Sequence, residues 1–553
     1  MTQAQKTYEK LLGIGTLILV LWHMLMSFGK YFFANYKAEL AFAGLLGAAA
    51  VIYLLLSLFK WKETRYRIID FFKKFRTPGQ IICILLFVWT ILSFLVNGMP
   101  HFKDNLWLIF DTGINCLILF NLPMVLSKEK AKKAIEWLLH IVSLFGLAVV
   151  LFGLWHLFTL NFITLKTGEI IGMTVYYSFQ LGSYYNLTAA ITLSFILIAF
   201  YMIASQSKLI KILYSISLIP YTLALLLTNS RAGFISCVSA YFLTVFLILW
   251  NQQSKRSIPV RLLICIAASA AAAGIIWEMR TWAFQLFETV THFSSGKLTH
   301  LTGISMTAGN HGVPDSSEIS QCMVLFSIPV FLSWEKMKEQ LTRLQYSLRR
   351  SAKISLLTAL VLVFCTVTSV VSPMIGSNSN IDYAQTSEKE TKTAAQAGED
   401  AVRDLNNMGT IKARERIWQE TISIMTSDWR SFLFGTTPIG TLDALKNVNA
   451  FHAHNQILQV GICIGVPMML VFTAFLILIG IKCIPLGLID GKRISHEAFI
   501  LPTVFISFII LTLVEAYLFA SFSIMSSLFF LFCGWINALD EERRKKGAEK
   551  SES

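Results

Sequence analysis

Residues 456–481 read QILQVGICIGVPMMLVFTAFLILIGI, a stretch of 26 residues without a charged side chain. A helix needs about 20 apolar residues to cross the hydrocarbon core of a bilayer, so this stretch is long enough to span a membrane. It is continuously apolar rather than alternating, which excludes a strand of a transmembrane barrel. Because backbone polar groups cannot remain unpaired in lipid, the stretch is expected to be a helix.

The same pattern recurs along the 553 residues, of which 55% are hydrophobic and 14% are charged. Ordinary soluble domains contain about 25% charged residues, so the composition excludes both a single soluble core and a disordered chain. We expect an all-α integral membrane protein, a polytopic bundle of about 14 (12–14) transmembrane helices with one large extracytoplasmic loop that carries amphipathic helices. The expected spans are 11–30, 38–59, 79–98, 105–126, 135–159, 183–205, 209–228, 232–250, 259–277, 320–334, 354–372, 456–481, 497–516 and 519–538.

The basic residues predict the orientation of the bundle. With the N-terminus inside, the inside loops and tails hold 32 of the 47 Lys and Arg residues, as the positive-inside rule requires. The net charge of +14 is therefore mainly a topology signal, and nucleic-acid binding is not expected. The first span has no small-residue cleavage site and is expected to be retained. We predict a multi-pass protein of the cytoplasmic (inner) membrane with both termini in the cytoplasm.

Loop lengths divide the chain. A shorter outside loop is expected over 278–319, and an amphipathic helix over 412–425 because apolar residues recur there at helical spacing. The expected units are N-terminal transmembrane helices (1–180), central transmembrane helices (181–372), a large extracytoplasmic catalytic loop (373–455), C-terminal transmembrane helices (456–540) and a basic cytoplasmic tail (541–553).

The chain lacks the usual motifs of cofactor sites. All nine cysteines lie in or at the ends of expected spans and form no CxxC pair, so they are expected to be apolar core residues. The sequence contains no GxGxxG, Walker A, HExxH or GxSxG motif. We therefore expect neither a cofactor nor a metal.

Three polar elements are expected on the outer face of the membrane. They are the turn Asn229-Ser230-Arg231-Ala232-Gly233, Arg414 at the start of the amphipathic helix, and His454-Asn455 directly before a span. The positive-inside bias disfavours an outside arginine, so Arg231 calls for a functional reason.

These elements resemble, in order and topology, the motifs of the bacterial O-antigen ligase and polymerase family over roughly residues 180–540. Where that family has Gly before the key Arg, this chain has Ala413, and Ser431-Phe432 replaces the usual Pro before Leu-Phe-Gly. The matching stretches are Tyr185-Asn186-Leu187-Thr188-Ala189, Thr228-Asn229-Ser230-Arg231-Ala232-Gly233, Arg414-Glu415-Arg416-Ile417-Trp418, Phe432-Leu433-Phe434-Gly435 and Ala453-His454-Asn455-Gln456-Ile457-Leu458-Gln459 with Gly465.

The resemblance implies an inverting, metal-independent glycosyltransferase that moves a glycan from undecaprenyl diphosphate to an acceptor hydroxyl. Arginine stays charged near lipid and its fork matches phosphate oxygens, so Arg231 and Arg414 are the expected diphosphate ligands. His454 is the expected base, because a neutral imidazole can accept the proton of a sugar hydroxyl. The implied partners are the lipid-linked glycan, an acceptor glycan or lipid, the bilayer, a chain-length regulator and a flippase.

Further candidates and alternatives remain at this stage. Arg416 is an alternative to Arg414, and His452 is an alternative to His454. Charge inside a span is costly, so Glu515 and Asp111 are functional candidates by default; Glu515 could pair with an arginine of the site, whereas Asp111 is more typical of a structural acid. The expected substrate-binding residues are Asn186, Arg416, Asn455 and Glu515.

The favoured function is polymerisation of the repeat units of a cell-surface polysaccharide. The alternative is a ligase that attaches the finished glycan to lipid A–core or to protein, since only the acceptor differs. A flippase is a further alternative, although such transporters usually show internal repeats and midplane binding groups, and none is evident here. A non-enzymatic receptor or scaffold would leave the arginines and histidine unexplained.

Overall fold

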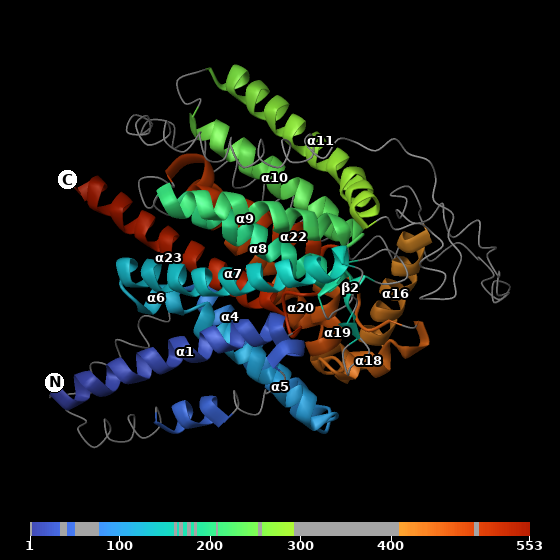
Figure 1. Ribbon diagram of the computed structural model, residues 1–553. Helices are drawn as coiled ribbons and strands as arrows, with labels where there is room; N and C mark the ends of the chain where they lie inside the picture. Colours follow the sequence, from blue (N-terminus) through green and yellow to red (C-terminus); the bar gives the residue numbers. More distant parts are fainter. Residues whose placement is uncertain are drawn as a thin grey trace, which may run out of the picture.

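The computed structural model describes residues 3–33, 41–49, 77–159, 163–164, 170–173, 179–181, 185–205, 208–252, 257–291, 409–448, 450–490, 497–521 and 523–552. These residues form a bundle of long helices with short helices and a small sheet gathered at one end (Figure 1). Ten of the described helices are long and apolar enough to cross a membrane. The chain is therefore a multi-pass membrane protein with a largely helical fold, as the apolar stretches predict.

The helices before the sheet include α1 (Gln3–Phe33), α4 (Pro78–Val96), α5 (Phe102–Gly113), the π-helix η1 (Ile114–Leu119), α6 (Leu122–Val125) and α7 (Lys128–Phe158). Four long helices follow the sheet: α8 (Tyr185–Ser205), α9 (Lys208–Leu227), α10 (Arg231–Gln252) and α11 (Ile258–Thr291). The remaining helices are α16 (Gly409–Thr426), α17 (Trp429–Phe434), α18 (Gly440–Ala444), η6 (Lys446–Val448), α19 (Gln456–Ile464), α20 (Val466–Pro485), η7 (Leu486–Asp490), η8 (Ala498–Ile500), α22 (Leu501–Thr512) and α23 (Ile524–Glu552).

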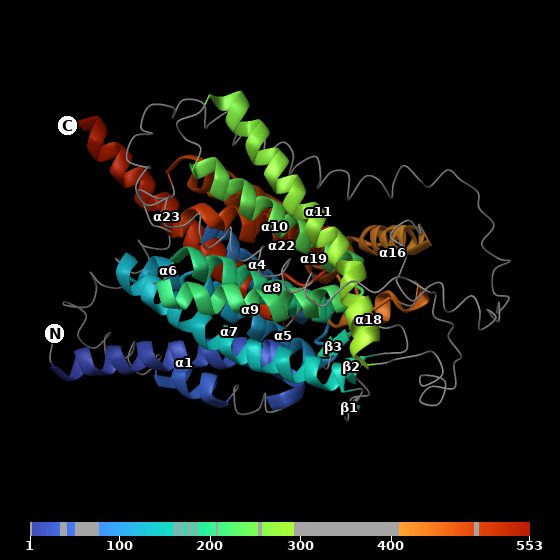
Figure 2. The same cartoon turned by 45° about the horizontal axis from the view of Figure 1, so that its top comes forward.

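Helix α8 is the central element of the bundle. Nearly all of its side chains are buried, which is the pattern of a helix that is apolar on every side and surrounded by others. It packs against α7, α9, α10, α22 and α23. The first turn of α8, which carries Asn186, lies at the end of the bundle where the sheet and α19 gather (Figure 2).

Both chain ends lie at the end of the bundle opposite to α16, α18 and the sheet (Figures 1 and 2). The sequence analysis predicts that both termini lie on one side of the membrane. The motif-bearing loops therefore gather at the far end from the termini.

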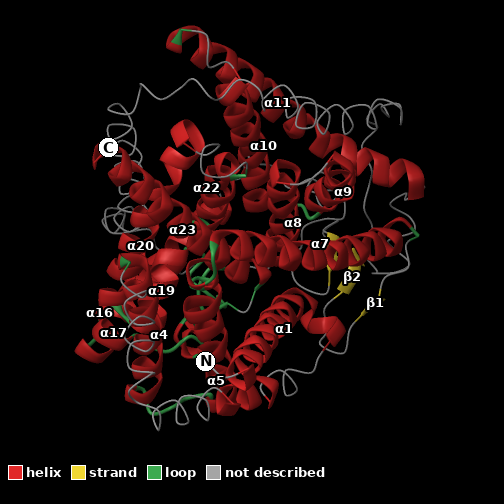
Figure 3. Ribbon diagram, turned by 90° about the vertical axis from the view of Figure 1, so that its left-hand side faces the viewer, coloured by secondary structure: helices red, strands yellow, loops and turns green. Residues whose placement is uncertain are grey.

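The fold departs from a purely helical one by a small antiparallel sheet, beside α7 (Figure 3). Its strands are β1 (Ile163–Thr164), β2 (Ile170–Met173) and β3 (Phe179–Leu181), in the order β1-β2-β3. Ile171 pairs with Ile163 on one side and with Leu181 on the other. The β-branched and aromatic residues of this segment favour strands, and the expectation of an all-α fold did not include them.

Several expected spans have different boundaries in the structure. The stretch 456–481 is divided at Gly465 into α19 and α20, and the span over 105–126 contains α5, η1 and α6. Helix α22 ends at Thr512, so Glu515 lies beyond it rather than inside a helix. Helix α11 continues through the first third of the loop expected over 278–319.

Some predictions lie outside the described residues. Of the span over 38–59, only residues 41–49 are described, and they are helical. The spans 320–334 and 354–372, and the part of the catalytic loop before residue 409, also lie outside the described residues. The expected number of 14 spans and the division into units stay predictions.

Candidate functional site

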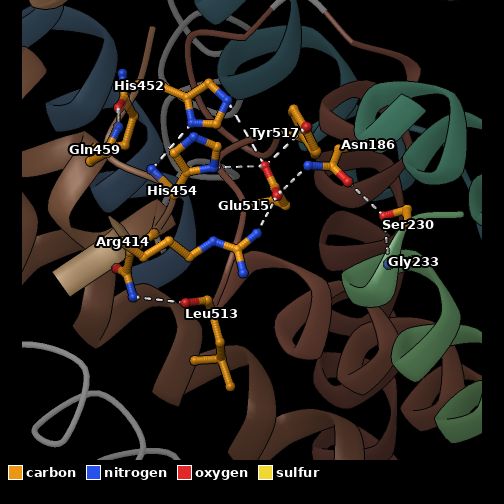
Figure 4. Close-up of polar contacts among 12 residues, drawn as sticks. Asn186, Ser230, Gly233, Arg414, His452, His454, Gln459, Leu513, Glu515 and Tyr517 are labelled. Carbon is orange, nitrogen blue, oxygen red and sulfur yellow. Dashed lines mark hydrogen bonds and ion pairs between the residues drawn. The ribbon is translucent and has the colours of Figure 1, made fainter. Parts of the chain in front are cut away.

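Glu515 is the centre of a polar cluster at the end of the bundle that lies far from both termini, and its side chain is fully buried. Its Oε1 accepts hydrogen bonds from Arg414 at 2.9 Å and from Asn186 at 2.8 Å (Figure 4). Its Oε2 accepts from the Tyr517 hydroxyl at 3.1 Å and lies 3.2 Å from Nδ1 of His454. One carboxylate thus joins α16, α8, the segment after α22 and the loop before α19.

The surroundings of Glu515 favour its ionised form. Burial raises the pKa of this carboxyl, but the hydrogen bond and charge of His454, together with His452 and Arg414, outweigh burial and hold the pKa below its usual value. Glu515 is therefore a carboxylate at neutral pH, and it can only accept hydrogen bonds.

The state of Glu515 determines which nitrogen of His454 carries the proton. Because the carboxylate accepts, Nδ1 of His454 must donate, which leaves the lone pair of the neutral ring on Nε2. The His454 side chain is 24% exposed, and its backbone is in the left-handed region with φ of 48°. A histidine oriented in this way by a buried acid is the arrangement of a general base.

His452 lies beside His454, with ring centroids 4.1 Å apart, but its lone pair is used differently. The backbone N–H of His454 donates to Nδ1 of His452 at 3.1 Å. Burial, reinforced by the charge of His454, lowers the pKa of His452 to about 4, so its ring is neutral and Nε2 carries the proton. His452 therefore has no acceptor nitrogen to offer a substrate hydroxyl.

The lowered pKa of His452 predicts a loss of stability in acid. An unfolded chain, with a histidine pKa of 6.5, binds the proton more tightly than the folded state, with a pKa of about 4. The contribution of neutral His452 to the free energy of unfolding is therefore fully present above pH 6.5. It falls between pH 6.5 and 4, by up to about 1.4 kcal/mol per pH unit. Tm of the purified protein should decline over this window, and His452→Gln should flatten the decline; an unchanged slope would contradict this assignment.

The cluster continues from Asn186 to the turn before α10. Oδ1 of Asn186 accepts from the Ser230 hydroxyl at 2.7 Å, and Oγ of Ser230 accepts from the backbone N–H of Gly233 at 3.2 Å. A side chain on Gly233 would overlap Ala189 of α8, so glycine allows α10 to approach α8 closely. Arg231, the first residue of α10, is thus placed beside a hydrogen-bond chain that leads to Glu515.

Asn455 and Arg416 are the remaining residues that were expected to bind substrate. Asn455 is fully buried; its Oδ1 caps α19 by accepting from the N–H groups of Ile457 and Leu458, and its Nδ2 donates to the Leu513 carbonyl. It therefore positions the neighbouring His454. Arg416 is exposed on α16.

Asp111 belongs to a separate buried cluster. Its Oδ1 lies 3.1 Å from Nε2 of His23 and accepts from Nδ2 of Asn115 at 3.1 Å. All three side chains are buried. These contacts are those of a structural acid rather than of a part of the Glu515 cluster.

Helix α16 has the amphipathic character that its sequence predicts. Ile417, Thr421 and Met425 are buried, and the helix packs against α19 and α17. The buried face fixes the helix on the bundle, so that Arg414 in its second turn reaches Glu515.

Two motif glycines bring the segment that follows α17 against the turn between α19 and α20. Gly435 has φ of 66° and Gly465 has φ of 95°, and a Cβ on either would overlap the backbone of the facing segment. Thr436 donates its N–H to the Ile462 carbonyl at 2.7 Å, and Thr437 to the Cys463 carbonyl at 3.0 Å. The two glycines therefore serve close packing as well as the turn itself.

Sequence reasoning missed the residues that hold this junction. One face of α4 supplies three side-chain donors to backbone carbonyls: Trp89 to Leu433, Ser93 to Cys463 and Asn97 to Gly435, at 3.0 to 3.1 Å. Their spacing of four residues places them on one helix face. That spacing, within an otherwise apolar span, is the only sign of them in the sequence.

Alanine at either Gly435 or Gly465 should destabilise the protein by roughly 2–4 kcal/mol, because it combines a left-handed backbone with a backbone clash. Thermal unfolding of the purified variants measures the effect. Gly98, which also has positive φ but has open space around it, provides the control. Gly98→Ala should lose less stability, because only the cost of the left-handed backbone applies there. Equal losses at all three positions would contradict the role of close packing.

His452, His454 and Glu515 are spaced as the ligands of a metal ion could be, since each offers a ligand atom within 4.8 Å of the others. A cation there would compete with Arg414 for the Glu515 carboxylate, which already receives hydrogen bonds from Asn186 and Tyr517. The donor set is therefore better suited to orienting His454 than to binding a metal.

Comparison of the chain with models of known families, with curated proteins and with solved structures gave no match.

Proposed function

We propose that this protein is a membrane glycosyltransferase that moves a glycan from undecaprenyl diphosphate to an acceptor hydroxyl and so polymerises the repeat units of a cell-surface polysaccharide. The observation that carries the proposal is the partly exposed His454, held through Nδ1 by buried, ionised Glu515, with Arg414 on the same carboxylate. The motif order of the sequence suggests the reaction class, and the contacts of His454 and Arg414 support their roles as base and cation.

In the proposed reaction, Nε2 of His454 accepts the proton of the acceptor hydroxyl as its oxygen attacks the anomeric carbon. The bond from that carbon to the diphosphate oxygen breaks, and the leaving diphosphate takes the electron pair. Its negative charge is stabilised by Arg231 and Arg414, which stay charged without a metal. Direct displacement inverts the anomeric configuration.

The proposal also assigns surroundings and partners. The site would lie on the extracytoplasmic face of the cytoplasmic membrane, where the lipid-linked donor meets an acceptor glycan or lipid. A flippase would supply the donor, and a chain-length regulator would limit the product. The gathering of α16, α18 and the sheet at the end far from both termini supports a site on the side opposite to the termini (Figure 1).

The test is the glycan chain-length profile of cells that lack the protein and are complemented with variants. Wild type and the control His101→Ala, a histidine paired with Asp443 outside the Glu515 cluster, should restore a ladder of long chains. His454→Ala should leave single lipid-linked repeat units. Long chains that remain on undecaprenyl diphosphate would instead indicate a ligase. A ladder restored by His454→Ala would refute the catalytic assignment.

A further inference from the structure

Glu515 lies in an irregular segment, residues 513–521, between α22 and α23. The regular hydrogen bonds of a helix therefore do not fix the position of this acid, and other contacts must do so. Because the orientation of His454 depends on the Glu515 carboxylate, the contacts that hold the segment bear directly on the proposed base.

The two residues that follow the base hold this segment on either side of Glu515. Nδ2 of Asn455 donates to the Leu513 carbonyl at 3.1 Å. Oε1 of Gln456 accepts from the backbone N–H of Leu518 at 2.7 Å. Both side chains are buried. The acid and the base are thus joined through the backbone as well as through their own side chains.

The carbonyl of Leu518 is also bonded to a side chain. The hydroxyl of Ser526, in the first turn of α23, donates to it at 2.9 Å, and the same Oγ accepts from Nδ2 of Asn115 at 3.0 Å. Leu518 is fully buried. A buried backbone N–H that loses its acceptor must find another, because leaving it unpaired costs free energy. Loss of the Gln456 oxygen is therefore expected to move the segment.

The two residues that hold the segment differ in what else they do. Asn455 also caps α19 by accepting from two backbone N–H groups at its start, so a substitution there would disturb the helix as well as the segment. Gln456 is the first residue of α19, and its oxygen is bonded to the segment. Gln456 is therefore the better position at which to separate the two effects.

We propose that Gln456 is a positioning residue that holds Glu515 against Nδ1 of His454. Because its side chain is buried, Gln456 acts through the backbone of Leu518 rather than on the substrate. This inference rests on the proposed function for the role of His454 as the base. It deepens that function, because it names what keeps the acid in register with the base.

The test is nitrogen NMR of the full-length protein, with isotopically labelled histidine, in lipid nanodiscs at alkaline pH, where histidine rings are ordinarily neutral. The ring-nitrogen shifts report which nitrogen carries the proton, and the His454 signals are identified by their loss in His454→Ala. Wild type should carry the proton on Nδ1, because the Glu515 carboxylate accepts it. Gln456→Met keeps the length of the side chain and removes the acceptor, so it should give a mixture of both tautomers, as Glu515→Gln should.

Gln80 provides a matched control. It is 1% exposed, as Gln456 is, and its Nε2 donates to Oδ1 of Asn121 at 2.8 Å, outside the Glu515 cluster. Gln80→Met also loses a buried amide but should leave the His454 tautomer unchanged. Gln456→Asn shortens the side chain by one methylene and takes its oxygen away from the segment. It should also give the mixture, and it decides the matter if Gln456→Met does not fold.

Kinetics of the purified protein give a second readout. Gln456→Met should lower kcat of glycan transfer severalfold, up to about 100-fold, which is the cost of a small misplacement. KM should change little, because the residue positions the acid rather than the substrate. In a Glu515→Gln background the same substitution should add little, because the residue through which it acts is already changed. Equal losses in both backgrounds would overturn the positioning role.

The outcomes separate this inference from the function on which it rests. A proton that stays on Nδ1 of His454 in Gln456→Met, or in Gln456→Asn if that variant decides, overturns the role of Gln456 and leaves the transferase intact. Equal mixtures in Gln456→Met and Gln80→Met would indicate a general loss of packing and also overturn the inference. A wild-type ring without the proton on Nδ1 overturns both. If wild type has the fixed tautomer but transfers no glycan, the proposed function is wrong, and the NMR comparison still decides whether Gln456 orients the ring.

Discussion

Glu515→Gln should lower the rate of the proposed glycan transfer by up to about 10,000-fold, the loss seen when the acid that orients a catalytic histidine loses its charge. Glutamine keeps the size of the side chain but offers an amide where His454 and Arg414 now find a carboxylate. His454 then loses both the fixed tautomer and the negative charge that stabilises its protonated form during the reaction. The loss should appear in kcat more than in KM, because the acid acts on the base.

The measurement is the initial rate of chain extension by purified protein with a lipid-linked donor. Glu497→Gln is the matched control, because Glu497 is also fully buried and paired, with Lys132 at 2.9 Å, outside the Glu515 cluster. Both variants lose a buried ion pair, and their Tm values report that common cost. A similar fall in rate for both would contradict a special role of Glu515.

The sequence predicts the spans well because the bilayer leaves few alternatives. A continuous apolar stretch in lipid must satisfy its own backbone, and a helix does so locally. Helix boundaries are less predictable, because apolar character does not say where a helix ends. Thus α11 continues past the expected span over 259–277 and includes the buried Arg280. By contrast, α22 ends at Thr512 and leaves Glu515 in an irregular segment.

The membership of the candidate site was more predictable than its connections. Asn186, Arg414, His454 and Glu515 stand out as polar or charged residues in unexpected places, and the structure joins them in one cluster. Asn186 and Glu515 are 329 positions apart, so no local pattern could show their contact. Uncharged donors such as Trp89 are hidden within an apolar span because their role is only to bind a backbone carbonyl.

The two adjacent histidines should differ sharply when each is replaced by alanine. His454→Ala should lower kcat by about 1,000-fold, within the range that general-base catalysis contributes. His452→Ala should cost about tenfold or less, because His452 accepts the backbone N–H of His454 and so supports its unusual φ. The two rings lie only 4.1 Å apart, so their positions are nearly the same. The expected difference therefore follows from the nitrogen atom that each ring has available.

The pH profile and chemical rescue make this comparison decisive. His452→Ala should keep the wild-type dependence of kcat on pH, since its own ring is neutral through the working range, with a pKa of about 4. His454→Ala should lose the limb that reports the base, and added imidazole should restore part of its rate, because the His454 ring is partly open to solvent. If His452→Ala lost the limb and His454→Ala kept it, with both proteins folded, the base would be His452 and the tautomer assignment would have to be reversed.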